Sequence, residues 1–193
     1  MAPSAAPREA RFGDAGHFVL DGTLSASLGH SGIHSAGVSS NSFSVQPAFD
    51  YFLGPDLSVG VSAFIRYDNL SSTMPYTTGQ RNVAYGVTGQ FGFNLWLAER
   101  VSFWPKLSLA LSQSRTTFPT PSVSPGTGTL VESAPNVENI VFVELYAPFL
   151  FHLAQHFFVG LGPDAYVDLV NSFGGVSNRR VFYGAESTVG GWF

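Results

Sequence analysis

The last stretch of the chain, residues 180–193, carries the pattern that most limits the fold. Counted back from Phe193 in steps of two, one face holds small or apolar residues such as Val181 and Val189, and the other face holds Glu186. Successive side chains of a β-strand point to opposite faces, so a period of two predicts a strand. This strand suits a sheet with lipid on one side and a polar filling on the other.

The same alternation recurs along the chain and predicts eight strands. The segments between the strands alternate between long loops rich in Gly, Ser, Thr and Pro and short turns. Short turns are expected at 54–56, 98–99 and 154–155, and long loops at 29–41, 69–80, 115–136 and 171–178. The strands are expected at about 17–29, 43–53, 57–68, 82–97, 101–112, 141–152, 157–168 and 180–193.

The chain has few charges for its length. Only 11% of its residues are charged, against about 25% in soluble domains, yet no run reaches the roughly 18 apolar residues of a spanning helix. These features favour an all-β, eight-stranded, antiparallel up-and-down transmembrane β-barrel. The absence of cysteine excludes disulfides and thiol chemistry, and the net charge of -4 argues against a nucleic-acid partner.

The N-terminus lacks the apolar core of a secretory signal peptide, so we expect a mature chain, with a flexible tail over residues 1–14 and the barrel over 15–193.

Four prolines fall inside predicted strands, where each removes a ladder hydrogen bond. We expect β-bulges to relieve them, and the strand register near them stays open. They are Pro47, Pro105, Pro148 and Pro163.

The closing strand resembles that of bacterial outer-membrane β-barrels, whose terminal Phe is the signal read by the barrel-assembly machinery; Phe193 matches it. The whole strand pattern resembles the small OmpA-, OmpX- and OmpW-like families. Leu161-Gly162-Pro163 and residues 187–193 are similar to uncharacterised outer-membrane β-barrel proteins of myxobacterial-type genomes. The resemblance implies a bacterial outer-membrane protein, with both termini and the short turns periplasmic and the long loops extracellular. Its implied partners are outer-membrane lipid, lipopolysaccharide and the assembly machinery, and the barrel itself is expected to be a monomer.

An eight-stranded barrel has an interior just wide enough for side chains to fill. Unpaired charges would be costly there, so we expect the inward charges to form a network. Lys106 with Glu144 is the first pair expected, since their strands are neighbours. Asp164, Glu186 and Asp21 would form an acidic wall that is protonated, hydrated or attracts a cation. The inward charges are Asp21, Asp50, Arg66, Lys106, Glu144, Asp164, Asp168 and Glu186.

Five aromatic residues lie near the predicted periplasmic end and point inward by parity. They would close that mouth and make a continuous water pore improbable. The alternative is an ordinary interfacial belt facing lipid, which Tyr51, Phe103, Phe157 and Phe193 fit. The inward aromatics are Phe52, Trp96, Trp104, Phe158 and Trp192.

Other constellations are weak. His30 and His34 have a spacing used by zinc helices but fall in a predicted loop without a third ligand, so we expect no metal and no cofactor. His152 near Glu144 could suggest acid/base work, but a lone inward His more often packs. Ser187 has no outward His beside it, and the His-x-Ser-Asn pattern of lipid A deacylases is missing. We therefore predict no catalytic residues.

The first functional hypothesis is a non-enzymatic barrel that anchors four surface loops for envelope integrity or surface interaction. A narrow channel or OmpW-like carrier for a small ion or apolar molecule is the alternative. A lipid-modifying enzyme is third. A soluble lipocalin-like barrel would show the inverse pattern, with apolar residues inside.

Overall fold

A computed structural model describes residues 10–33, 36–72, 79–121, 130–132, 134–171 and 181–193. In these residues the regular structure is β-strand, and no helix there is long and apolar enough to cross a membrane. The strands are β1 Phe18–Ile33, β2 Ala36–Gly54, β3 Leu57–Ser72, β4 Gln80–Phe93, β5 Leu95–Ala98, β6 Val101–Phe103, β7 Lys106–Thr117, β8 Pro119–Pro121, β9 Leu130–Glu132, β10 Asn136–Tyr146, β11 Phe149–Ala154, β12 Phe157–Asn171 and β13 Val181–Trp192.

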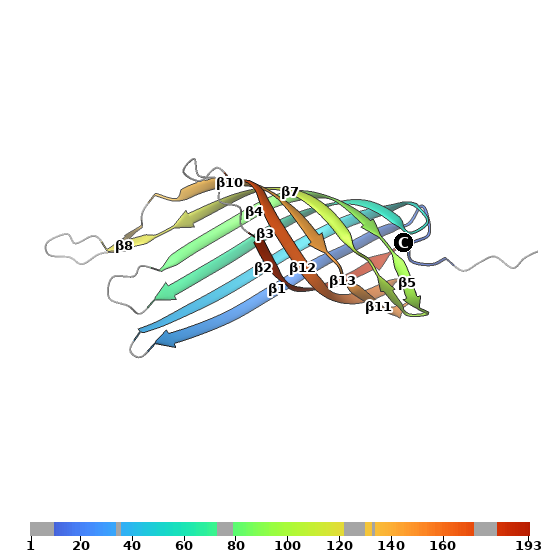
Figure 1. The fold of residues 1–193 in the computed structure, drawn as a ribbon, viewed down its shortest axis with the longest axis horizontal. Helices are drawn as coiled ribbons and strands as arrows, with labels where there is room; N and C mark the ends of the chain where they lie inside the picture. The colour runs from blue at the N-terminus through green and yellow to red at the C-terminus, as the bar shows by residue number, and fades with distance from the viewer. Residues whose placement is uncertain (1–9, 34–35, 73–78, 122–129, 133, 172–180) are drawn as a thin grey trace, which may run out of the picture.

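The strands close into a ring. Antiparallel pairing runs from β10 through β7, β4, β3, β2, β1 and β13 to β12, and β12 pairs with β10, so the ring has eight strands. Figure 1 shows these strands running obliquely around the axis, as ring closure requires. The predicted eight-stranded antiparallel β-barrel is confirmed.

The two ends of the barrel differ. We call the end with the C-terminus and the three short connections the turn end, and the opposite end the loop end (Figure 1). The predicted turns are confirmed, because β2 and β3, β5 and β6, and β11 and β12 are each joined by two residues. Asp56 in the first turn has a φ of 63°, a conformation that Asp tolerates better than most residues.

Strands at the loop end extend further than the sequence suggested. The loop expected at 29–41 is wrong, because β1 and β2 pair continuously up to Ile33 and Ala36. Part of the loop expected at 115–136 also forms strands, with β8 paired to β9. Backbone ladders need no apolar side chains, so Ser- and Gly-rich segments without alternation can continue a strand.

Three of the eight ring strands are interrupted near the turn end. The breaks at Asn94, Trp104-Pro105 and Ala147-Pro148 separate β5, β6 and β11 from β4, β7 and β10. Backbone hydrogen bonds still cross between neighbouring strands at this level, from Phe93 N to Pro105 O, Trp104 N to Pro148 O and Ala147 N to Pro163 O, each 3.0 Å.

The prolines do not act as expected. Pro105 and Pro148 fall in strand breaks, whereas Pro47 and Pro163 lie within β2 and β12. In the described residues the register shift away from the turns falls between β10 and β12, where Val141 pairs with Val170 and Phe142 with Asp168. The bulges expected at the prolines were therefore wrong. The alternation of inner and outer side chains passes through all four prolines unchanged.

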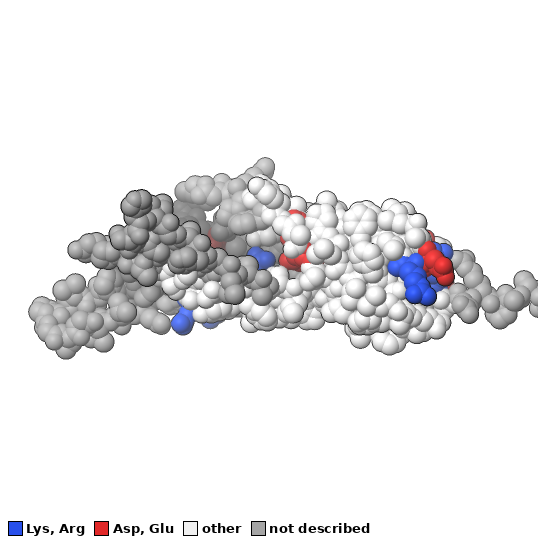
Figure 2. Space-filling model, turned by 90° about the horizontal axis from the view of Figure 1, so that it is seen from below, with Lys and Arg blue, Asp and Glu red and all other residues white. Residues whose placement is uncertain are grey.

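Burial follows this alternation around the ring. Outward residues are exposed, as Val61 at 62%, Phe91 at 63% and Leu161 at 59% show, while inward Asp50 and Ser58 are fully buried. Figure 2 shows charged side chains gathered at the turn end beside a broad uncoloured surface, and the other charged atoms in that view lie close to grey residues. The barrel is apolar outside and polar inside over most of its height.

The expected tail of residues 1–14 needs correction. Residues 1–9 lie outside the described residues, but residues 11–14 pack into the turn end, and Phe12 is 1% exposed. Asp56 N donates to Gly13 O at 2.7 Å, and Gly16 N donates to Phe52 O at 2.9 Å. Hydrogen bonds and apolar burial together fix this segment on the barrel.

Candidate functional site in the barrel lumen

An aromatic cluster fills the turn end of the lumen. Phe12 lies at its centre, with ring centroids 5.2 Å from Phe52, 5.2 Å from Trp104 and 5.4 Å from Phe158. These spacings and the steep angles between the rings are those of favourable edge-to-face contacts. We call this cluster the aromatic plug; its buried members are Phe12, Val19, Phe52, Trp104, Leu150, Phe158 and Trp192.

All five inward aromatics singled out from the sequence meet at the aromatic plug. Trp96 is the half-buried one, and its Nε1 donates to Phe12 O at 3.0 Å. The outward aromatics differ, since Phe157 is 41% and Phe193 67% exposed, and Tyr51 and Phe103 are half-buried. The turn end therefore has both an inner set and an outer set of aromatic side chains.

His152 belongs to this end of the lumen. Its ring stacks on Trp96 with centroids 4.6 Å apart, and its Nε2 lies 3.0 Å from Ser102 Oγ. The suggested acid/base group with Glu144 is not the arrangement found. Ser187 is exposed and its hydroxyl donates to Leu24 O at 3.2 Å, while His30 lies in β1 and His34 lies outside the described residues.

A buried lysine lies directly above the aromatic plug. Lys106 Nζ is 2.8 Å from Asp21 Oδ2 and 3.0 Å from Asp50 Oδ2, and the three side chains are at most 4% exposed. The same ammonium lies 3.7 Å from the centroid of a Trp104 ring, at cation–π distance. We call Lys106, Asp21 and Asp50 the lysine centre.

The lysine centre joins opposite walls of the barrel. Lys106 begins β7, whereas Asp21 and Asp50 lie on the paired strands β1 and β2. The pairing expected between Lys106 and Glu144 was wrong, because the register places Tyr146 opposite Lys106 and Ser108 opposite Glu144. A lysine side chain is long enough to cross this narrow lumen, so strand adjacency did not identify its partners.

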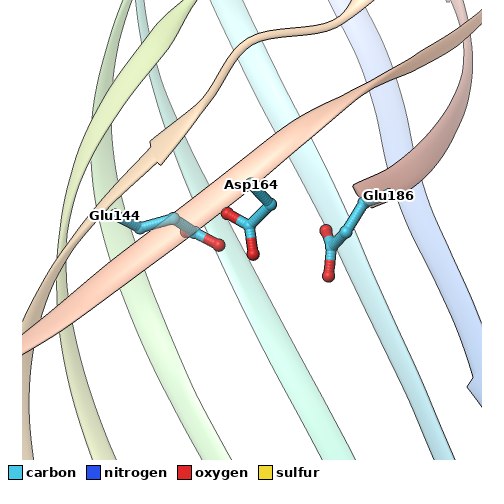
Figure 3. A group of neighbouring side chains, drawn as sticks. All are labelled: Glu144, Asp164 and Glu186. Carbon is cyan, nitrogen blue, oxygen red and sulfur yellow. The ribbon is translucent and has the colours of Figure 1, made fainter. Parts of the chain in front are cut away.

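Three carboxylates form a second group further from the turn end. Glu144 on β10, Asp164 on β12 and Glu186 on β13 offer oxygens that all lie within 4.8 Å of one another. Figure 3 shows the Asp164 carboxylate between the other two. We call these residues the acidic cluster. It contains two of the three residues that the sequence placed in an acidic wall; Asp21 belongs to the lysine centre.

The remaining inward charges lie nearer the loop end. Arg66 Nη1 donates to the Tyr166 hydroxyl at 3.2 Å, and Asp168 is 3% exposed. Both line a cavity of about 460 Å³, the upper cavity, which is bounded mainly by small or polar side chains such as Ser44, Asn82 and Ser114. A void of about 20 Å³ lies between the lysine centre and the acidic cluster.

Sequence reasoning missed several of these residues. Phe12 stood in a segment taken as a tail, and its only signal was an isolated aromatic near the first strand. Gln90, which donates to Asp50 Oδ2 at 2.7 Å, and Tyr166, the partner of Arg66, were inward by parity but not chosen. The sequence does not show which inward neutral polar side chains hydrogen-bond to a buried charge and which only fill the lumen.

Comparisons with known proteins add the following. No protein-family model matches the chain, and no curated protein matches it. Solved structures similar to it at low identity include the following three, and each alignment covers most of both chains. Neisserial surface protein A has 16% identity and a TM-score of 0.45 over 92% of this chain and 96% of that one. The outer membrane protein OprG from Pseudomonas aeruginosa has 11% identity and a TM-score of 0.45 over 93% of this chain and 97% of that one. The N-terminal β-barrel domain of P. aeruginosa OprF has 12% identity and a TM-score of 0.41 over 93% of this chain and 98% of that one. At such values these likenesses carry no conclusion about function.

Proposed function

We propose that this chain is an integral outer-membrane β-barrel without enzymatic activity, closed at its turn end, that anchors loops for envelope integrity or surface interaction. The observation that carries the proposal is the outer surface. Large apolar side chains face outward on every strand of the ring, while buried Asp, Ser, Thr and Gln face the lumen. Water would penalise this arrangement and lipid would favour it.

The height of the apolar surface fits a bilayer. On β3 it runs from Leu57 to Tyr67, which at about 3.3 Å per residue and a tilt of about 40° covers about 25 Å. Beyond it, outward positions on neighbouring strands become polar, with Asn69 on β3 and exposed Arg115 on β7. Tyr67 and Tyr85 lie near this upper border, as aromatic girdles do at membrane interfaces.

The aromatic plug supports a closed lumen. Its central Phe12 and the rings of Phe52, Trp104 and Phe158 are at most 1% exposed, and the lysine centre adds a buried charge layer directly above. Hydrated ions would have to displace both layers. We therefore expect no steady conductance in planar bilayers at neutral pH. Discrete, reproducible openings of the purified wild-type barrel would contradict the closed-lumen proposal.

Orientation is tested by cysteine labelling, because the chain has no cysteine of its own. Ser71→Cys marks the loop end and Gln155→Cys the turn between β11 and β12, and both positions are exposed. If the loops are extracellular and the turns periplasmic, a membrane-impermeant maleimide should label Ser71→Cys on intact cells and Gln155→Cys only after permeabilisation. The reverse pattern would contradict the proposed orientation, and labelling of both on intact cells would contradict a sealed outer membrane.

The upper cavity favours a second candidate function, binding or passage of a small solute. Its volume of about 460 Å³ lies within the range of small-molecule sites, about 300–1,000 Å³. A carrier would release its solute past the plug or through the wall. Solute uptake by cells that produce the wild-type barrel, with conductance still absent, would favour this second function.

Four expectations from the sequence remain untested predictions. They are recognition of Phe193 by the assembly machinery, contact with lipopolysaccharide, a monomeric state and a relation to barrels of myxobacterial-type genomes.

A further inference from the structure

Among the described residues the acidic cluster has no ion-pair partner. Its three carboxylates, from Glu144, Asp164 and Glu186, have oxygens within 4.8 Å of one another (Figure 3). Carboxylates that share a site so closely repel, and they do not all stay ionised without compensation. Either protons or a cation must therefore neutralise the cluster.

In the described residues no cation makes a direct ion pair with the cluster, although Arg66 attracts all three carboxylates from a distance. Lys106 makes its two ion pairs with Asp21 and Asp50. Arg66 donates to the Tyr166 hydroxyl, and the ion pairs found in the described part of the chain do not include one between Arg66 and the cluster. Burying carboxylates without a direct ion pair costs several kcal/mol per ion, so a bound cation or bound protons would add to the distant attraction of Arg66.

One buried oxygen of the cluster lacks a partner, and a second such oxygen lies at the neighbouring lysine centre. Asp164 is 7% exposed, and its Oδ1 has no hydrogen-bond partner. Asp21, which is outside the cluster, is 8% exposed, and its Oδ1 also lacks a partner. Asp21, Glu144 and Glu186 border the same void of about 20 Å³, which has room for one water or ion. Buried polar atoms without partners are rare in folded proteins.

We propose that Glu144, Asp164 and Glu186 bind a divalent cation, and that Ca²⁺ fits this site best. Ca²⁺ binds oxygens at about 2.3–2.6 Å, so two ligands of one ion lie at most about 5.2 Å apart. The spread of 4.8 Å meets this limit without movement of the strands. Water in the upper cavity, which Glu144 and Glu186 also line, completes the six to eight ligands of the ion.

Mg²⁺ fits this site less well than Ca²⁺. Its ligands lie at about 2.0–2.1 Å, so two of them are at most about 4.2 Å apart, and Mg²⁺ gives up its waters reluctantly. A bound Ca²⁺ would link β10, β12 and β13, which are three consecutive neighbours in the ring. This inference goes beyond the proposed function and does not depend on it, because the cluster is set by the barrel fold alone.

The test is a calcium titration of the full chain, folded in uncharged detergent micelles after treatment with a chelator. We expect one Ca²⁺ per wild-type barrel by calorimetry and a rise in the thermal unfolding midpoint, with a weaker response to Mg²⁺. Asp164→Asn and Glu144→Gln should each weaken Ca²⁺ binding at least about ten-fold, because ligand charge sets calcium affinity. Heat-modifiable gel migration verifies that each variant is folded.

The matched control is Asp68→Asn. Asp68 lines the same upper cavity but lies outside the acidic cluster, where Asn82 donates to it at 3.4 Å. This variant should change Ca²⁺ affinity no more than about three-fold, the effect expected of a more distant charge. Equal losses in Asp68→Asn and Asp164→Asn would indicate diffuse attraction by the lumen and would overturn a defined site.

A cluster that only shares protons predicts a different set of results. Wild type would show no calcium heat and no shift of its unfolding midpoint. Asp164→Asn would then raise that midpoint equally with calcium and with chelator, because it removes one repelling charge. Either result would overturn the proposal, and the wild-type titration decides even if a variant fails to fold.

Discussion

Replacing Lys106 with Met should lower the free energy of unfolding of the barrel. The methionine keeps most of the side-chain volume but leaves two buried carboxylates without their cation. Lys106 Nζ lies 2.8 Å from Asp21 and 3.0 Å from Asp50, with side chains that are 4%, 2% and 0% exposed, respectively. Breaking one such buried pair costs about 3–5 kcal/mol. Since Lys106→Met leaves two carboxylates without their ion-pair partner, we expect a loss of about 5 kcal/mol in the free energy of unfolding at neutral pH.

The measurement is reversible urea unfolding in lipid vesicles, followed by tryptophan fluorescence. Trp104 contacts the Lys106 ammonium and reports on this layer directly.

The control is a charge-free centre that combines Asp21→Asn, Asp50→Asn and Lys106→Met. Replacing a whole buried ionic group is often close to neutral, so we expect this variant to lose at most about 2 kcal/mol. A loss below about 1 kcal/mol for Lys106→Met alone at neutral pH is what an exposed ion pair gives. That result would refute the burial argument.

Three further predictions use the same unfolding assay. Phe12→Ala should lower the free energy of unfolding by about 3–5 kcal/mol because it empties the centre of the aromatic plug. The control Phe18→Ala, at an outward residue that is 45% exposed, should lower it by less than half as much. Equal losses would contradict the plug. Gly60→Ala should cost more than about 1 kcal/mol, because its Cβ would overlap Asp50 Oδ1, whereas Gly89→Ala, with nothing within 4 Å, should be neutral or slightly stabilising. Val61→Arg, in the middle of the apolar outer surface, should lower the free energy of unfolding by about 2–4 kcal/mol, and Ser71→Arg, beyond that surface, by at most about 1 kcal/mol. Similar losses for the two variants would contradict the proposed membrane position.

The fold followed from the sequence because alternation is a local property. Each strand of a barrel shows its inner and outer faces in its own residues, as Val61 and Ser62 do on β3, so eight strands could be recognised without knowledge of their neighbours. The extension of β1 and β2 to Ile33 and Ala36 was missed because their Ser- and Gly-rich ends lack that alternation. Backbone hydrogen bonds hold those ends, and they leave no trace in side-chain type.

The site was less predictable because its contacts cross the lumen. Parity placed Lys106 inward, but its partners Asp21 and Asp50 depend on the curvature and stagger of the whole ring. The acidic cluster joins neighbouring strands and was partly anticipated through Asp164 and Glu186. Phe12 had neither a strand nor a neighbour to give it a direction. Contacts between adjacent strands can be inferred from the order of strands, whereas contacts across the axis require the barrel geometry.

Side-chain volume along the axis explains why one end of the lumen is filled and the other holds a cavity. Eight strands fix a nearly constant radius, so filling depends on which residues point inward at each level. At the turn end, inward glycines make room for large rings, and a Cβ at Gly190 would lie 2.5 Å from Phe158 Cζ. Towards the loop end small inward residues such as Ser44, Ala84 and Ser114 lie among larger ones such as Phe64 and Tyr166, and a cavity of about 460 Å³ remains. The strand number alone therefore does not decide whether the lumen is filled, because the filling at the turn end depends on which large rings and glycines point inward there.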